Sequence, residues 1–447
     1  QRILKETSTP VDYEDHKLQV SSSIGVVYYG HNYGKNEGSE QLLRLADQAM
    51  YTAKQRGKNK IQHYAWDNIK NKSELVNAFK NGLFELYYQP KVNCKTGEVT
   101  SLEGLIRLNH PVKGVLRPIE FLTDIEQFDL MDQLSRFVIL EGVQYLESLN
   151  HNRQNKIGIS LNIQGNSLLH KEFVDELVAL FKNNPKISPE QMTLEILESA
   201  SLGKVEKIAK QINLLKAEGF RFSIDDFGTG YASLTYLKNL PVNEIKIDQE
   251  FIREMFSETN SLSIIEAIKS MAEAFNLSII AEGAETDEHI ELLLQLGIES
   301  VQGYAIAKPM PQSEMNRWLK TWRTNPYWQT LTEISVAEKR LLKARLAHIS
   351  WINKFDKLLA QEKATITISS YLNCEFGLWL INEGKQILSD QEYQKIDFLH
   401  QEIHRIGNLI IESKSLDLEN ETSKLLALFK INSLKLDSLL KTIQNQL

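Results

Sequence analysis

The chain has 447 residues, of which 42% are hydrophobic and 24% charged, and its formal net charge is −7. These proportions are typical of a folded protein, and the length predicts roughly two to four domains. The acidic balance excludes a general nucleic-acid-binding protein, which would present a basic face, so we expect no DNA or RNA partner. It leaves room for a nucleotide substrate, because a bound metal ion supplies its own positive charge.

The two cysteines, Cys94 and Cys374, lie far apart, so we expect no disulfide framework and a reducing, cytoplasmic compartment. No apolar run approaches the roughly 20 residues that cross a bilayer, and no signal peptide is recognisable. The chain starts at Gln1, without Met and inside what looks like a domain. We therefore expect a fragment of a longer protein, and a membrane anchor or sensor upstream of Gln1 stays open.

The first region, residues 1–65, contains a strand-like run, Leu18–Tyr29, and then a helical stretch, Leu42–Lys58. Ser-Ser-Ile-Gly-Val at 22–26 and Ala-Asp-Gln-Ala-Met-Tyr-Thr-Ala-Lys-Gln-Arg-Gly-Lys-Asn at 46–59 resemble the C-terminal part of a GGDEF diguanylate cyclase domain.

The signature loop of that family should precede this segment, and it is absent. Lys54 and Lys58 correspond to phosphate-contacting positions of the family, but without the loop we interpret them as the solvated end of a helix. We expect no synthesis of cyclic di-GMP by this chain, and a fragment that is poorly stable or docks on something.

The middle region, about residues 70–323, alternates strand-like runs with amphipathic helical stretches. This alternation predicts a (β/α)₈ barrel, and a doubly wound open sheet is the competing fold. No glycine-rich dinucleotide-binding motif follows the first strand, which weakens the open sheet. The eight strand candidates are Phe84–Gln89, Thr100–Arg107, Ile157–Asn162, Met192–Leu197, Arg221–Asp225, Glu244–Asp248, Ser278–Glu282 and Ser300–Tyr304.

Polar and acidic residues lie at or near the C-terminal ends of these strands, the rim at which barrel enzymes place their sites. So many carboxylates would repel one another unless cations neutralised them, and oxygen ligands favour Mg²⁺ or Mn²⁺. Each residue alone has a simpler interpretation, such as a helix cap, a turn or a surface lysine. The set comprises Glu103, Asn162, Glu195, Glu198, Asp225, Asp226, Lys246, Glu282 and Gln302.

The region from about Glu74 to Trp322 resembles a complete EAL phosphodiesterase domain. The motifs that carry the resemblance are Tyr-Tyr-Gln-Pro at 87–90, Glu-Gly-Leu-Ile-Arg at 103–107, Asn162, Glu195 with Glu198, Asp-Asp-Phe-Gly-Thr-Gly at 225–230, Lys-Ile-Asp at 246–248, Ala-Glu-Gly-Ala-Glu-Thr at 281–286 and Gln-Gly-Tyr at 302–304. Two positions depart from the family pattern. Gly104 replaces an alanine and Leu197 a threonine, and neither change removes a ligand.

The resemblance implies a role for each residue. The first Mg²⁺ or Mn²⁺ would bind to Glu103, Asn162, Glu195 and Asp225, and the second to Asp225, Asp226 and Glu282. Lys246 would contact or deprotonate the attacking water, and a lysine near two cations should have a lowered pKa. Glu198 would brace the loop after Asp226. Substrate contacts and orientation of the water would fall to Gln89, Arg107 and Gln302.

The third region, about residues 332–447, contains no proline and shows helical spacing of Leu and Ile. Three imidazoles and one thiolate suit tetrahedral Zn²⁺, although a histidine pair is often incidental and a lone cysteine is often a core residue. The candidates are His348, Cys374, His400 and His404. His-x-x-Trp, Cys-x-Phe-Gly-x-Trp-Leu and His-x-x-x-His resemble the CZB family of zinc-binding four-helix bundles, whose members are implicated in zinc sensing. His110, in contrast, is expected to be structural.

We therefore predict an α/β protein: a TIM-like barrel, preceded by a truncated cyclase-type domain and followed by an all-α four-helix bundle. The predicted boundaries are 1–65, a linker at 66–73, 74–323, a linker at 324–338, and 339–447. The resemblance implies hydrolysis of cyclic di-GMP to linear pGpG by two metals under zinc control, and a homodimer is plausible. Two alternatives stay open: a receptor that binds cyclic di-GMP without cleaving it, and a net cyclase in the complete protein.

Overall fold

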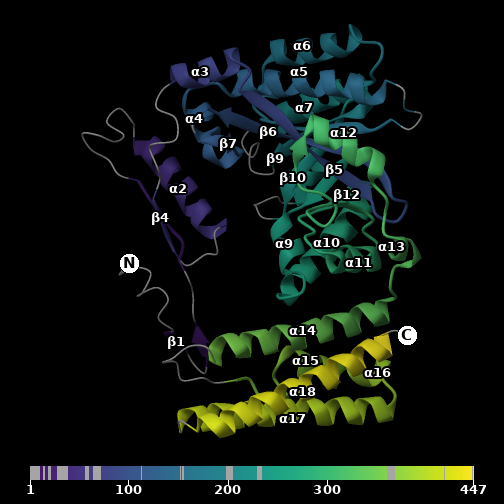
Figure 1. Ribbon diagram of the computed structural model, residues 1–447. Coiled ribbons are helices and arrows are strands. Elements are labelled where there is room, and N and C mark those ends of the chain that lie inside the picture. Colours follow the sequence, from purple (N-terminus) through teal and green to yellow (C-terminus); the bar gives the residue numbers. More distant parts are fainter. Residues whose placement is uncertain are drawn as a thin grey trace. The chain divides into compact units, whose positions relative to one another are not determined.

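The computed structural model describes most of the chain (Figure 1). The described residues are 11–13, 16–18, 22–27, 39–55, 60–63, 72–111, 113–151, 153, 156–197, 205–228, 234–359, 368–416, 418–444 and 446. Contacts divide the chain into two units, residues 1–86 with 106–137 and residues 87–105 with 138–447. Among the described residues, no helix combines the length and apolar character that crossing a lipid bilayer requires.

Eight strands close into a barrel, in the order β5, β6, β8, β9, β10, β11, β12 and β13, with β13 returning to β5. The neighbouring pairs from β6 to β13 are parallel, whereas β5 runs antiparallel to β13. The strands are β5 (Phe84–Asn93), β6 (Glu98–His110), β8 (Gly158–Ile163), β9 (Met192–Leu197), β10 (Arg221–Phe227), β11 (Glu244–Ile247), β12 (Ser278–Glu282) and β13 (Ser300–Gln302). The barrel prediction is confirmed, and each of the eight strand candidates corresponds to one of these strands.

Helices connect the parallel strands. These segments form helices with one buried face because their apolar residues recur every three or four positions. In α7, for example, Ile208, Ile212 and Leu215 are all buried. The connecting helices are α5 (Met131–Asn150), α6 (Lys171–Lys182), α7 (Val205–Ala217), α8 (Leu234–Asn239), α9 (Gln249–Glu254), α10 (Thr259–Phe275) and α11 (Asp287–Gln295). β14 (Met310–Pro311) pairs with β5, and α12 (Gln312–Thr321) and α13 (Pro326–Thr330) follow.

The first unit contains the short strands and helices near the N-terminus. Strand β3 pairs in parallel with β4, and helix α2 contacts both. Gly25 is required in β3, because a Cβ there would lie 1.8 Å from the carbonyl oxygen of Ala46 on α2. Lys54 is exposed at the end of α2, and Lys58 lies outside the described residues. The elements are β1 (Val11–Tyr13), β2 (His16–Leu18), β3 (Ile24–Val26), α2 (Ser39–Gln55), β4 (Ile61–His63), α3 (Lys72–Lys80), β7 (Gly114–Leu116) and α4 (Leu122–Gln127).

The C-terminal region is helical in all its described elements, as predicted. Its long helices are α14 (Val336–Leu359), α17 (Asp390–Ser415) and α18 (Glu419–Gln444). A shorter helical segment from Glu375 to Ile387 comprises α15 (Glu375–Trp379), a π-helical turn and α16 (Lys385–Ile387). Their shared core is built from aromatic and branched side chains, among them Phe355, Phe376, Ile403 and Phe429.

Candidate metal centres

Two overlapping groups of carboxylates lie at the C-terminal rim of the barrel. In each group one potential ligand atom from every residue lies within 4.8 Å of the others. The first group is Glu103, Glu195 and Asp225, and the second is Asp225, Asp226 and Glu282. Because Asp225 belongs to both, the arrangement can hold two neighbouring cations that share one bridging carboxylate.

A bulge in β10 directs two consecutive aspartates toward this rim. The register between β10 and β11 shifts between Ile224 and Phe227, so an extra residue is accommodated there. Asp226 has a φ of 55°, in the left-handed region that few residues other than glycine adopt. Gly228 has a φ of 103°, and a Cβ there would lie 2.8 Å from the ring of Phe251. Glycine is therefore required at position 228, and the left-handed conformation of Asp226 is the kind of strained backbone that clusters at functional sites.

Lys246 lies at the centre of the carboxylates and is 1% exposed. Its Nζ is 2.6 Å from Glu195 Oε2, 2.7 Å from Asp225 Oδ1 and 2.5 Å from Glu282 Oε1. It also lies 3.4 Å from Glu103 Oε1. Burial alone would lower the pKa of Lys246, but these carboxylates outweigh burial and raise the pKa well above its usual value. In this arrangement Lys246 is therefore a cation that partly neutralises the cluster.

One ammonium cannot balance all of these acids. Burial raises the pKa of Glu282 well above its usual value, and Asp225 and Glu103 add to the effect although Lys246 opposes it. Burial also raises the pKa of Glu103. The pKa of Asp226 rises to about 8 through burial and the neighbouring Asp225 and Asp248. A set of acids that resist ionisation together is the electrostatic environment that divalent cations relieve.

Amide side chains surround Glu103. Asn162 Nδ2 donates to Glu103 Oε1 at 2.9 Å, which leaves the amide oxygen of Asn162 available as a ligand. Gln302 Nε2 donates to Glu103 Oε2 at 2.5 Å and to Gln89 Oε1 at 3.0 Å. These contacts bring Asn162, Gln302 and Gln89 to the acidic groups.

Two predicted site residues remain to be placed, Arg107 and Glu198. Arg107 lies four residues beyond Glu103 along β6 and belongs to the other unit of the chain, where its guanidinium donates to the carbonyl oxygen of Ile106 at 2.8 Å. Glu198 lies outside the described residues.

Sequence reasoning missed Lys91, which is 0% exposed on β5. Its Nζ lies 2.5 Å from Glu195 Oε1 and 2.9 Å from Ser160 Oγ. Burial alone would raise the pKa of Glu195, but Lys246 and Lys91 outweigh it and lower the pKa to about 2. The available signal was a lysine followed by an apolar residue, in Pro-Lys-Val, directly after the predicted strand Phe84–Gln89.

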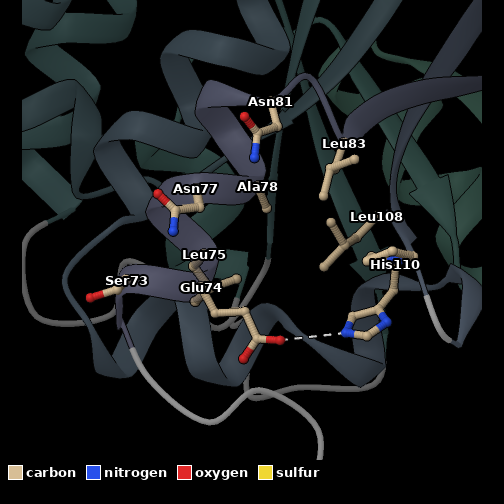
Figure 2. Close-up of a pocket in the computed structure, with 10 residues that line it drawn as sticks. Ser73, Glu74, Leu75, Asn77, Ala78, Asn81, Leu83, Leu108 and His110 are labelled. Carbon is tan, nitrogen blue, oxygen red and sulfur yellow. Dashed lines mark ion pairs between the residues drawn. The ribbon is translucent and has the colours of Figure 1, made fainter.

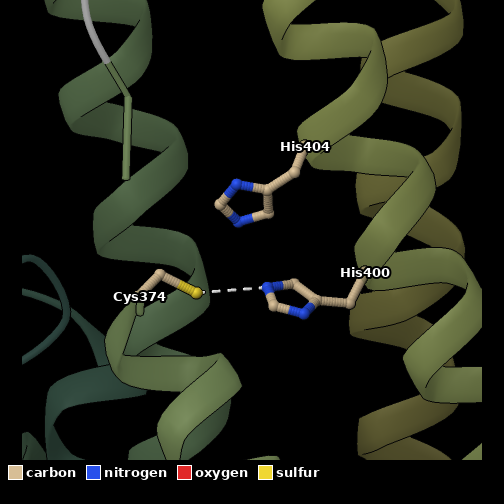
Figure 3. A group of neighbouring side chains, drawn as sticks. All are labelled: Cys374, His400 and His404. Carbon is tan, nitrogen blue, oxygen red and sulfur yellow. Dashed lines mark hydrogen bonds between the residues drawn. The ribbon is translucent and has the colours of Figure 1, made fainter. Parts of the chain in front are cut away.

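A second group of ligand atoms lies in the helical region (Figure 3). Cys374, His400 and His404 have ligand atoms within 4.8 Å of one another, and Cys374 Sγ lies 3.2 Å from His400 Nε2. The Cys374 sulfur also accepts a hydrogen bond from the backbone nitrogen of Gly377 at the start of α15. His404 Nδ1 lies 3.0 Å from the carbonyl oxygen of Ser369, which orients the ring, while the buried Nε2 has no hydrogen-bond partner among the described residues.

His348, on α14, is near this group but is not one of its three members. Its ring centroid lies 6.2 Å from that of His400, and within the described part of the chain its buried Nε2 also has no hydrogen-bond partner. Burial lowers the pKa of His348 and His400 to about 3 and that of His404 to about 4, so all three rings are neutral near pH 7. Zn²⁺ binds neutral imidazoles and the thiolate that forms when a cysteine loses its proton, and buried nitrogens without a partner among the described residues fit such a site.

A pocket between α3 and β6 carries no comparable cluster (Figure 2). Leu75, Ala78, Leu83 and Leu108 supply its apolar lining. His110 Nε2 lies 3.5 Å from Glu74 Oε1, and its Nδ1 accepts from the backbone nitrogen of Lys113. His110 thus makes local contacts, in line with the structural role expected for it.

Comparisons with known families divide the chain into three matched segments. The EAL domain model matches residues 72–309, which is more than half of the chain. The chemoreceptor zinc-binding domain (CZB) model matches residues 348–411, and the diguanylate cyclase GGDEF domain model matches residues 1–60. EAL domains use divalent metals, and CZB domains bind zinc.

Curated relatives are 31% and 32% identical to this chain over the aligned residues. One is the bifunctional diguanylate cyclase/cyclic di-GMP phosphodiesterase MucR of Pseudomonas aeruginosa, which is 32% identical over 70% of this chain and 46% of its own length. Another is the cyclic di-GMP phosphodiesterase PdeR of Escherichia coli, 31% identical over 72% of this chain and 49% of its own length. The chain thus spans about half the length of these relatives.

Solved structures show the same barrel. The PaMucR phosphodiesterase, in complex with c-di-GMP, is 33% identical with a TM-score of 0.52 and covers 54% of this chain and 98% of its own. The EAL enzyme Bd1971, with cAMP and cyclic di-GMP bound, is 29% identical with a TM-score of 0.54 and covers 65% and 77%. The match of the family model to more than half of the sequence, together with this fold, shows that the chain belongs to the EAL domain family.

Proposed function

We propose that this chain hydrolyses cyclic di-GMP to linear pGpG at the rim of the barrel, with two divalent cations. The observation that carries the proposal is the overlap of two acidic groups at Asp225. Relatives named as cyclic di-GMP phosphodiesterases and a neighbouring structure solved with c-di-GMP support the substrate. Mg²⁺ and Mn²⁺ are the ions that oxygen ligands of this kind favour.

The proposed ligands fall into two sets, one for each ion, and Asp225 belongs to both. Glu103, Asn162, Glu195 and Asp225 would hold the first ion, and Asp225, Asp226 and Glu282 the second. A pair of cations in such a site activates a water and stabilises the leaving oxygen of a phosphodiester.

Lys246 contacts both groups and would hydrogen-bond the attacking water. The carboxylates keep Lys246 protonated in the arrangement described above, so a base role requires cations to offset their charge. Gln302 would hold Glu103 and orient the water, and Gln89 and Arg107 would contact the substrate, Arg107 through a phosphate. Glu198 keeps its proposed role of bracing the loop after Asp226.

A product assay tests this function directly. With Mg²⁺ or Mn²⁺ we expect the native chain to convert cyclic di-GMP to pGpG, and Glu103→Ala and Lys246→Ala to lose turnover. A native chain that binds cyclic di-GMP but forms no product would contradict hydrolysis and favour the receptor function. The same samples, measured by light scattering, test the proposed homodimer.

We further propose that zinc regulates the barrel through α14. Lys343 and Lys354 on α14 form ion pairs with Glu266 on α10 and with Glu258 at its N-cap. Helix α10 packs against β11 and β12, the strands of Lys246 and Glu282. His348 lies on α14 between the two lysines, so drawing it into the group of Cys374, His400 and His404 would act on a helix already attached to the barrel.

Zinc titration tests the regulatory proposal. Adding Zn²⁺ to the metal-depleted chain should change the turnover of cyclic di-GMP, and chelation should reverse the change. If the C-terminal domain gains and loses zinc while turnover stays constant, regulation by zinc is wrong although the hydrolytic function can still hold.

The domain boundaries 1–65, 74–323 and 339–447, with linkers at 66–73 and 324–338, likewise stay proposals, and limited proteolysis tests them.

A further inference from the structure

Lys91 is a fully buried ammonium that none of the roles above uses. It lies on β5, the antiparallel strand of the barrel, and its exposed fraction is 0%. Its Nζ is 2.5 Å from Glu195 Oε1, 2.9 Å from Ser160 Oγ and 3.6 Å from Glu244 Oε1. Three different strands of the barrel therefore converge on one lysine.

Packing does not account for a charge at this place. Barrel interiors are ordinarily filled by branched apolar side chains. A buried ion pair loses solvation when it forms, and well-packed apolar residues of similar volume are often as stabilising or more so. Stability alone therefore does not explain Lys91, because Leu or Val could fill the same space. The contact of Lys91 with Glu195 is the other candidate reason for it.

The two oxygens of Glu195 are held by two different ammonium groups. Lys246 bonds Oε2 at 2.6 Å, and Lys91 bonds Oε1 at 2.5 Å. Ser160 precedes Asn162 by two residues on β8, and Glu244 precedes Lys246 by two residues on β11. Lys91 therefore reaches Glu195 from below the rim, while Lys246 reaches it from the rim itself.

We expect cation binding to affect the contacts of Lys246 and Lys91 differently. A cation bound by the rim carboxylates competes with Lys246, because Lys246 contacts members of both acidic groups. Lys91 contacts Glu195 through the other oxygen, and its further partners, Ser160 and Glu244, are outside both groups. The contact between Lys91 and Glu195 can therefore persist in the loaded site.

We propose that Lys91 is a positioning residue that fixes the carboxylate of Glu195 so that Oε2 faces the first cation. The inference rests on the proposed two-metal function. Mg²⁺ and Mn²⁺ require near-ideal geometry of their oxygen ligands, and a ligating carboxylate is itself held by hydrogen bonds from a surrounding layer. Loss of such a holding residue typically weakens metal binding about 10- to 100-fold.

Direct Mn²⁺ titration of the full chain, followed by electron paramagnetic resonance of the free ion, tests the role. The variant is Lys91→Met, whose unbranched side chain is one heavy atom shorter and carries no charge. The matched control is Lys182→Met, because Lys182 also pairs with a glutamate, Glu218, but on the surface. We expect Lys91→Met to bind one Mn²⁺ about 10- to 100-fold more weakly than the control and the second Mn²⁺ as the control does.

Turnover gives an independent readout. Because Lys91 touches no substrate in the proposed site, the kcat of Lys91→Met at saturating Mn²⁺ should approach that of the control, while the Mn²⁺ concentration for half-maximal activity rises. If Lys91→Met does not fold by circular dichroism, Lys91→Gln is titrated instead; its shorter, neutral side chain should also weaken one Mn²⁺ site.

The outcomes separate the two proposals. Equal Mn²⁺ affinities in the folded Lys91 variant and in Lys182→Met overturn the role of Lys91 and leave the two-metal function intact. A native chain that binds no Mn²⁺ overturns the two-metal function and the role of Lys91 with it. A selective loss of one of two Mn²⁺ ions supports both.

Discussion

The acidic cluster of the barrel and the thiol–imidazole cluster of the helical region both bury potential metal ligands, but they differ in the charge of those ligands. Both gather potential metal ligands from separate elements into a buried place. In the barrel the donors are acids, and burial raises the pKa of Glu103 and Glu282. In the helical region burial lowers the pKa of His348 and His400 to about 3, so these donors are neutral near pH 7.

Because of this difference, we expect metal binding to require a different rearrangement in each region. In the barrel Lys246 is a counter-charge, and cations bound as proposed would compete with that ammonium for the same oxygens. The helical cluster needs no counter-charge, and Zn²⁺ displaces only the proton of a thiol. If His348 is the fourth ligand, as proposed, it would have to move, because it is not within the 4.8 Å group of Cys374, His400 and His404. Loading is thus mainly electrostatic in the barrel and mainly conformational in the helices.

The largest expected effect comes from removing the charge shared by both acidic groups. Asp225→Asn should reduce turnover of cyclic di-GMP by roughly 10²- to 10³-fold, the scale seen when a group that stabilises the transition state is lost. Zinc content should not change, because the helical cluster has its own ligands. Asp175→Asn, at an exposed aspartate on α6, is the control. Turnover of Asp225→Asn within a few-fold of the control would show that the barrel does not depend on a shared carboxylate.

Zinc binding should stabilise the helical region without requiring the barrel site. A ligand present at 100 times its Kd adds about 2.7 kcal/mol, which corresponds to a rise in Tm of roughly 10 °C or more for a domain of about 100 residues. Calorimetry with and without Zn²⁺ measures this shift. Cys374→Ser should abolish it, whereas Cys94→Ala should retain it, because Cys94 is buried in the barrel. A zinc-dependent shift that survives Cys374→Ser would place the ion elsewhere.

Sequence patterns predicted the barrel well because strand and helix periodicities are local properties of the chain. The direction of β5 was not predictable in the same way, since alternation looks identical in parallel and antiparallel strands. The short connection Cys94–Gly97 was the available sign of a hairpin, because a parallel connection needs a longer crossover.

For the site, the motifs identified residues but not their contacts. Glu103, Glu195, Asp225 and Glu282 converge as the strand-end argument requires, because parallel strands end at the same rim. Lys91 was missed because it comes from the antiparallel strand and reaches the cluster from below. The distance between His348 and its expected co-ligands depends on how α14 packs, which spacing along the sequence does not determine.

A smaller effect is expected at the contact between α14 of the helical region and α10 of the barrel. Lys343→Glu should leave zinc binding and zinc-free turnover unchanged but reduce the zinc-dependent change in turnover. Exposed ion pairs contribute about 0.2–1 kcal/mol, so the zinc response should fall by no more than roughly fivefold. Combining Lys343→Glu with Glu266→Lys reverses the pair and should restore part of the response. If the single and double variants respond to zinc as the native chain does, this ion pair carries no coupling.

The smallest expected effect concerns Leu197, where the family pattern has threonine. Leu197 is the last residue of β9, two positions after Glu195, and its side chain is 43% exposed. Exposed substitutions away from special features usually change the free energy of unfolding by less than about 0.5 kcal/mol, and Leu197 supplies no ligand. Leu197→Thr should therefore leave Mn²⁺ affinity unchanged and alter turnover by less than about threefold, a change of roughly 0.65 kcal/mol in activation free energy. A tenfold change in turnover with unchanged Mn²⁺ affinity would mean that the end of β9 positions something other than the metal. The acidic cluster would then depend on the residues that follow Leu197 as well as on its own charges.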